Sequence, residues 1–138
     1  MSVKLYSIGQ DSTEKALCGP LELDRKALGR FGEDEASKYL LSEGFEILRR
    51  NFRNRFGEVD IIARKGSAVH FIEVKTRRTN SCGYPDECVN GLKKNKILRT
   101  ALWYLNGDGR AFKNHSIAFD LVAIYIKENL ISIKFIEF

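Results

Sequence analysis

The spacing of hydrophobic residues predicts two amphipathic helices. In residues 25–43, the apolar side chains of Phe31, Ala36, Tyr39 and Leu40 recur at helical spacing, as expected when one face of a helix packs on a core. Asp24 stands directly before this segment as an N-cap, and Gly44 follows it as a residue suited to a left-handed helix end. A second helix is expected over about residues 86–105, with its end at Gly107.

Five further segments have the shorter hydrophobic period or the continuous apolar character of β-strands. They are residues 45–54, 58–64, 68–76, 116–126 and 130–138. The segment 116–126 (SIAFDLVAIYI) is apolar almost throughout, which is typical of a strand covered on both faces. The order of helix, three strands, helix and two strands predicts an α/β fold in which helices flank a mixed central sheet.

The domain organisation predicted from these patterns is simple. Residues 1–24 show little periodicity, and we interpret them as an N-terminal extension that includes at most a strand. Neither an internal repeat nor a proline-rich linker follows, so residues 25–138 are expected to form one domain. Because no apolar run approaches the ~20 residues that span a bilayer, and the N-terminus lacks the apolar segment of a signal peptide, we expect a cytoplasmic protein without a membrane partner.

Composition and charge point to a globular domain with an anionic partner. Hydrophobic residues make up 43% of the chain and charged residues 30%, which excludes a disordered or low-complexity protein. The net charge is +5, and because residues 1–24 hold two basic and four acidic side chains, residues 25–138 carry a net +7. A basic domain suits a polyanion such as nucleic acid, although charge alone leaves an ordinary basic surface equally open.

The acidic residues of one predicted hairpin are the most informative pattern in the sequence. If residues 66–67 form a two-residue turn, positions whose numbers sum to 133 lie opposite each other, which pairs Asp60 with Glu73 and Glu58 with Lys75. Side chains alternate along strands, so these four share one face. Two carboxylates about 5 Å apart repel by about 3 kcal/mol, a cost that protonation, the ammonium of Lys75 or a bound divalent cation would offset.

Such a cluster suits metal-dependent phosphodiester hydrolysis. Oxygen ligands with room for water favour Mg²⁺ or Mn²⁺, and the cysteines have no CxxC spacing that would favour zinc. With the ion on Asp60 and Glu73, Lys75 could orient or activate a water molecule or stabilise a developing oxyanion, and Glu58 would be an accessory acid. The alternative is a solvated hairpin with scattered salt bridges, which the apolar residues flanking the acids argue against.

Other charged residues are candidates for the same site. Glu33 lies on or beside the helix stripe that faces the sheet, with Gly29 and Gly32 allowing close approach, although it could equally reach solvent. Basic side chains near the hairpin and on the second helix are expected to bind phosphates, or else to form a solvated basic surface. They are Arg53, Arg77, Arg78, Lys93 and Lys96.

Several linked motifs then resemble one family. GRFGE at residues 29–33, GEVD at 57–60, EVK at 73–75, Lys93 and AFDLVAI at 118–124 occur in this order. Over roughly residues 27–125 the sequence resembles the bacterial YraN-like family of predicted endonucleases. That family is similar to archaeal Holliday-junction resolvases and belongs to the PD-(D/E)XK, restriction-endonuclease-like nucleases.

The resemblance implies a fold, a site and an activity. The fold would be the restriction-endonuclease-like αβββαβ core. Asp60 and Glu73 would bind Mg²⁺, Lys75 would be the catalytic lysine, and Glu33 would be the additional helix-borne acid of resolvase-like members. The protein would then be an endonuclease that hydrolyses phosphodiester bonds in DNA, including branched or damaged DNA.

Two other functions are compatible with the sequence. The chain could be a nucleic-acid-binding protein on a nuclease scaffold without catalysis, although the complete Asp60, Glu73 and Lys75 set argues against a degenerate site. It could also be a protein-interaction adaptor that uses residues 1–24. A homodimer is a further expectation, since two-fold dimers are common among proteins that cut both strands, but nothing in the sequence requires one.

Overall fold

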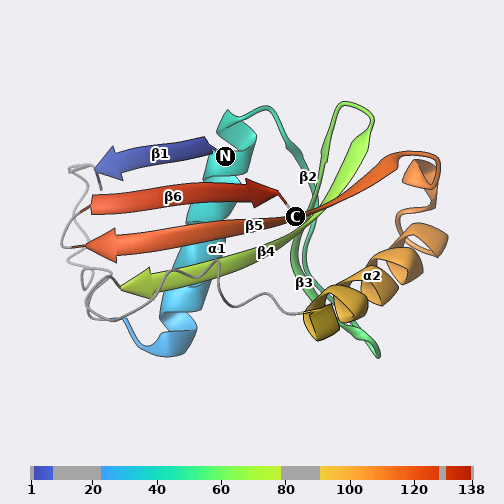
Figure 1. Ribbon diagram of the computed structural model, residues 1–138, viewed down its shortest axis with the longest axis horizontal. Coiled ribbons are helices and arrows are strands. Elements are labelled where there is room, and N and C mark those ends of the chain that lie inside the picture. The colour runs from blue at the N-terminus through green and yellow to red at the C-terminus, as the bar shows by residue number, and fades with distance from the viewer. Residues whose placement is uncertain (1, 8–22, 79–90, 128–129, 138) are drawn as a thin grey trace.

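A mixed six-stranded sheet forms the centre of the molecule (Figure 1). The computed structural model describes residues 2–7, 23–78, 91–127 and 130–137. The elements are β1 (Ser2–Ser7), α1 (Arg25–Ser42), β2 (Glu46–Asn54), β3 (Gly57–Lys65), β4 (Ala68–Arg78), α2 (Gly91–Asn106), a 3-10 turn (Arg110–Phe112), β5 (Ser116–Lys127) and β6 (Leu130–Glu137).

The strand order is β1-β6-β5-β4-β3-β2, and only the β4–β5 pair is parallel among the pairs described. This is a restriction-endonuclease-like α/β fold with the expected αβββαβ core. β1 adds an edge strand beside β6, and residues 1 and 8–22 of the expected extension lie outside the described residues.

The helix ends follow the predicted capping residues. The Asp24 carboxylate accepts the backbone N–H of Ala27 at 2.7 Å, and Gly44 adopts a φ of +86° just beyond the last turn of α1. For α2, the predicted first residues 86–90 lie outside the described part of the chain, as do the three cysteines. Neither of the two α-helices described is long and apolar enough to cross a membrane.

The two helices cover opposite faces of the sheet. Leu40 and its neighbours in α1 pack against Ile61 and Ile124, whereas Ile97 and the following turns of α2 pack against Ile62 on the other face. Consecutive residues of β3 therefore enter different cores, as alternation along a strand requires. The centre of β5 is fully buried, as predicted for a strand covered on both sides.

The β3–β4 hairpin has the predicted register over part of its length. Gly66 has a φ of +58°, as expected at the first position of a type II′ turn, and the pairs from Lys65–Ala68 to Ile61–Ile72 all sum to 133. In the part of the chain described, the ladder ends at Ile61–Ile72. The predicted ladder pairs Asp60–Glu73 and Glu58–Lys75 are therefore both wrong, because beyond Ile61 β3 stays with β2 while β4 continues beside β5.

Helix α1 packs closely against β4 at Gly32. A Cβ atom at this position would lie 1.7 Å from Oγ1 and 2.9 Å from Cβ of Thr76, so the helix axis can sit at its observed distance only without a side chain there. Gly29 differs, since a Cβ atom there would meet nothing within 4 Å. The two glycines provide a matched pair for testing the contact.

We expect Gly32→Ala to lower the free energy of unfolding by about 1–3 kcal/mol, because the new methyl group overlaps Thr76. Gly29→Ala should be neutral or stabilise by up to about 1 kcal/mol through helix propensity. Urea denaturation followed by circular dichroism measures both. Thr76→Ala should recover part of the loss in the Gly32→Ala background, and equal effects of the two glycine substitutions would contradict the proposed close contact.

Candidate functional site

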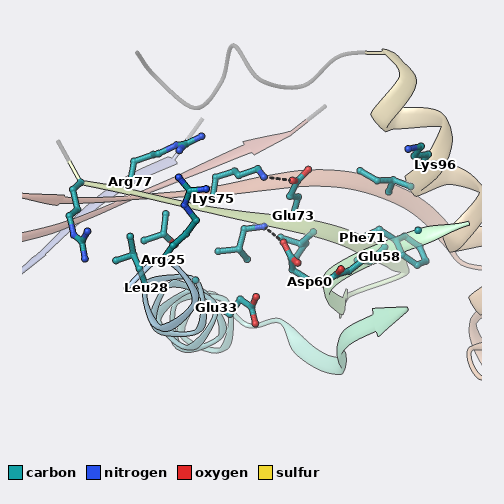
Figure 2. Close-up of a pocket in the computed structure, with 18 residues that line it drawn as sticks. Arg25, Leu28, Glu33, Glu58, Asp60, Phe71, Glu73, Lys75, Arg77 and Lys96 are labelled. Atoms are coloured by element: carbon teal, nitrogen blue, oxygen red, sulfur yellow. Dashed lines mark hydrogen bonds and ion pairs between the residues drawn. The ribbon is translucent and has the colours of Figure 1, made fainter. Parts of the chain in front are cut away.

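A cleft of about 890 Å³ opens where β3 and β4 part (Figure 2). Four carboxylates contribute to its walls: Glu33, Glu58, Asp60 and Glu73. Five basic side chains also line it: Arg25, Lys75, Arg77, Arg78 and Lys96. α1, β3, β4 and α2 therefore bring most of the predicted site residues together around one cavity.

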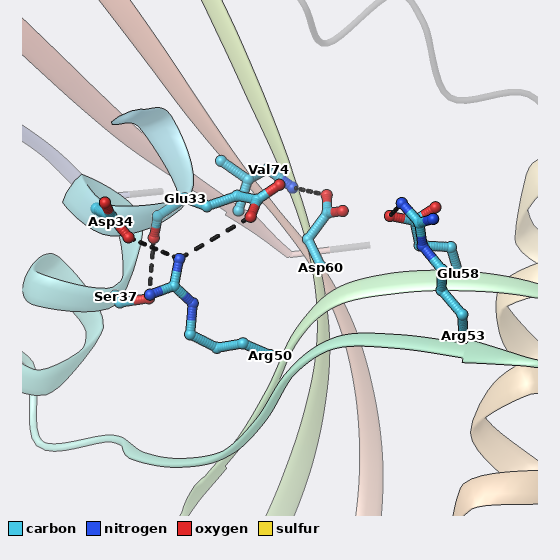
Figure 3. A network of polar contacts seen from close by, with 8 residues as sticks. All are labelled: Glu33, Asp34, Ser37, Arg50, Arg53, Glu58, Asp60 and Val74. Atoms are coloured by element: carbon cyan, nitrogen blue, oxygen red, sulfur yellow. Dashed lines mark hydrogen bonds and ion pairs between the residues drawn. The ribbon is translucent and has the colours of Figure 1, made fainter. Parts of the chain in front are cut away.

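The side chain of Asp60 takes the place of a backbone hydrogen-bond acceptor where the β3–β4 ladder ends. Its Oδ2 atom accepts the backbone N–H of Val74 at 2.8 Å, a donor that would otherwise lack a strand partner on that side (Figure 3). On the other side, Asp60 faces Asn51 of β2, which has a φ of +52°. This conformation is uncommon for a residue with a side chain, and asparagine tolerates it better than most. The local break in both ladders allows the carboxylate to turn into the cleft.

Glu73 and Lys75 lie two positions apart on β4 and therefore project from the same face. The Lys75 Nζ atom lies 3.0 Å from Glu73 Oε1, and the carboxylate is 11% exposed. Figure 2 shows this pair beside Asp60, with both acids directed into the cavity. The expected face shared by Asp60, Glu73 and Lys75 is thus present, although it arises from parted strands rather than from a continuous ladder.

The electrostatic environment of Asp60 is unusual. Burial raises the pKa of its carboxyl group to about 6, and the negative charges of Glu33, Glu73 and Glu58 add to this effect. The hydrogen bond from Val74 acts in the opposite direction. The acidic centre of the cleft therefore carries a negative potential that a cation would relieve.

Glu33 faces the cleft rather than open solvent. Its side chain is 20% exposed, and Arg50 of β2 lies 3.9 Å from its Oε2 atom while donating a hydrogen bond to Asp34 at 2.8 Å (Figure 3). The guanidinium thus occupies the outer side of the Glu33 carboxylate. The inner side is directed towards Val74 and Asp60.

Glu58 and Arg53, two further predicted site residues, form an ion pair with each other. Arg53 donates a hydrogen bond to Glu58 at 3.0 Å, and both side chains are largely exposed (Figure 3). Glu58 lines the cleft, and its negative charge contributes to the raised pKa of Asp60. Arg53 does not line the cleft. The side chain of Lys93 lies outside what the structure describes.

The donors present fit a hard divalent cation. Among the residues described, no three His, Cys, Asp or Glu side chains form a ready-made cage for a metal ion. Asp60 and Glu73 offer carboxylate oxygens beside a cavity large enough for water and substrate. Mg²⁺ typically binds through one or two carboxylates, with water and phosphate oxygens completing its shell, whereas structural zinc requires four protein ligands.

Arg25 is the charged residue of the cleft wall that the sequence patterns above did not indicate. A signal for it was present, because Arg25, Gly29 and Glu33 follow one another at four-residue intervals along α1. Extending the stripe one turn towards the N-terminus would have placed Arg25 on the same face.

Comparison with known proteins places these residues in a family. The model of Uncharacterised protein family UPF0102 matches residues 32–124. A UPF0102 protein of Caldicellulosiruptor saccharolyticus is 38% identical over 117 residues, covering 83% of this chain and 98% of that protein. Those of Persephonella marina and Syntrophotalea carbinolica are 41% and 47% identical, covering 77% and 72% of this chain and 89% and 80% of the relatives. The chain therefore belongs to the UPF0102 family, and the resemblance indicated by its motifs is confirmed.

Proposed function

We propose that the protein is a Mg²⁺-dependent endonuclease that hydrolyses phosphodiester bonds in DNA. The observation that carries this proposal is the convergence of Asp60, Glu73 and Lys75 in one cleft, with Asp60 and Glu73 placed to hold the ion. When bound there, a divalent ion would neutralise phosphate charge and lower the pKa of a coordinated water. The family match itself supports membership alone, so the activity rests on the geometry of the site.

Lys75 is best suited to donate hydrogen bonds. Its ammonium lies 3.0 Å from the Glu73 carboxylate, and an ammonium group has three hydrogen-bond donors and no acceptor. We assign it to orienting the attacking water and to stabilising charge that develops on the phosphate. Glu33, on the opposite wall, adds negative charge that favours cation binding.

The distribution of charge in the cleft suits a polyanionic strand. Figure 2 shows Arg25 and Arg77 at one end of the cavity and Lys96 at the other, with the acids between them. A nucleic-acid backbone lying along the cleft would have phosphates near the basic ends and one phosphate at the acidic centre. The basic ends would supply affinity with or without a metal ion, and the acidic centre would hold a phosphate only once a metal ion is bound there.

We expect Asp60→Asn, Glu73→Gln and Lys75→Met each to reduce metal-dependent DNA cleavage by about 10²-fold or more, since each removes a ligand or a charge donor. A gel assay with linear, flapped and four-way DNA in Mg²⁺, Mn²⁺ or EDTA measures this. Glu35→Gln is the matched control, because Glu35 lies on α1 but pairs with Lys38 away from the cleft.

Full cleavage by all three variants would contradict the mechanism. Salt-sensitive DNA binding without any cleavage, and without a metal requirement, would instead favour a non-catalytic nucleic-acid-binding protein. Cytoplasmic location and a homodimer stay predictions, to be tested by fractionation and by light scattering.

The raised pKa of Asp60 predicts a pH-dependent stability difference. In the metal-free protein the folded state holds this proton more tightly than the unfolded state, so ionised Asp60 destabilises the fold above pH 6. Asp60→Asn should therefore raise the free energy of unfolding at pH 7.5 by up to about 3 kcal/mol relative to the wild type, and the gain should decline below pH 6 and vanish near pH 4.

Chemical denaturation of both proteins at matched pH values, in EDTA, measures this difference. Asp108→Asn is the control, because Asp108 is 62% exposed and lies away from the cleft. A gain from Asp60→Asn that stays constant from pH 7.5 to pH 4 would show that ionisation of Asp60 is not its cause.

A further inference from the structure

An exposed aromatic cluster joins the β2–β3 turn to α2. The rings of Phe56 and Trp103 meet edge to face, with centroids 6.1 Å apart. The guanidinium carbon of Arg55 lies 4.8 Å from the Phe56 centroid and 5.4 Å from the Trp103 centroid. Trp103 remains 50% exposed, so the contact leaves half of this large apolar side chain in solvent. These three residues are called the Trp103 cluster below.

The Trp103 cluster lies beside the cleft. Gly57 and Glu58, which directly follow Phe56, line the cavity, as does Lys96 of α2 (Figure 2). Lys96 and Trp103 are seven residues apart, which places them on one side of the helix about 10.5 Å from each other. That separation corresponds to roughly three nucleotide steps at the ~3.4 Å spacing of a stacked strand.

The surroundings of the cluster are positively charged. The sequence of α2, Gly91–Asn106, contains four basic residues and no acidic residue, and Arg55 adds a charge directly at the rings. An exposed ring on a basic surface is complementary to a nucleic-acid strand, in which flat apolar bases alternate with phosphates. If the rings served only to fasten the turn to the helix, burial of Trp103 would be expected instead.

We propose that the Trp103 cluster stacks an unpaired base of the nucleic acid whose phosphates occupy the cleft. An aromatic face accepts any base, and the Arg55 guanidinium strengthens stacking through its planar charge. The faces of paired bases are covered by their neighbours in a duplex, so the cluster selects strands with unpaired bases next to the cleft, such as single strands and branch points. This inference rests on the proposed function for the position of the phosphates.

Trp103 is the only tryptophan in the chain and therefore reports directly on the site. In EDTA, which prevents cleavage, a short oligothymidylate should quench its fluorescence, whereas a blunt hairpin duplex should quench it much less. Anisotropy of labelled oligonucleotides gives the affinities in parallel. Trp103→Ala should weaken binding of the single strand about tenfold and change duplex binding less than twofold.

Leu102→Ala is the matched control, because Leu102 is 46% exposed on the same helix but is not part of the cluster, and it should leave both affinities unchanged. Unquenched fluorescence at saturating oligothymidylate, or an equal loss from Leu102→Ala, overturns the stacking site. DNA cleavage with unquenched Trp103 overturns this inference alone, whereas quenching without metal-dependent cleavage supports it and overturns the proposed nuclease function.

Discussion

The hydrogen bond from the Val74 backbone to the Asp60 carboxylate is the contact on which the site depends. It lies where the β3–β4 ladder ends, and it satisfies a backbone donor that the departing strand no longer serves. A side chain that replaces a backbone acceptor allows two strands to part without leaving a buried N–H unpaired. The cavity between them, and the exposure of Glu73 and Lys75 to it, follow from this exchange.

Because a carboxylate replaces the backbone acceptor, negative charge is concentrated in the partly buried centre of the cleft. Burial, with the charges of Glu33 and Glu73 adding to it, raises the pKa of the Asp60 carboxyl group to about 6. A folded domain has only about 5–15 kcal/mol of net stability, so the cost of ionising a carboxyl group in this position is substantial. The arrangement is easier to explain by a cation that relieves it than by structural need, because β3 could continue its ladder with an apolar residue at this position.

The sequence predicted the parts of the fold that depend on local rules. The N-cap at Asp24, the turn at Gly66 and the register up to Ile61–Ile72 follow from capping, turn geometry and alternation. The position of Glu58 could not be predicted in this way, because alternation assumes that both strands stay paired. Strand parting depends on tertiary contacts, with β2 drawing one strand aside and β5 holding the other.

The Trp103 cluster also depends on tertiary packing, since the sequence does not show that the β2–β3 turn meets α2. The packing of α1 against β4 shows how tertiary contacts control the charge of the site. Gly32 lies against Thr76, which directly follows Lys75, while the next residue of the helix, Glu33, faces the cleft. A side chain at position 32 would push this part of α1 away from β4 and take the Glu33 carboxylate with it. The negative charge around Asp60 therefore depends on a steric contact made by the neighbouring residue of the same helix turn, so the close packing of α1 on β4 controls the electrostatics of the cleft.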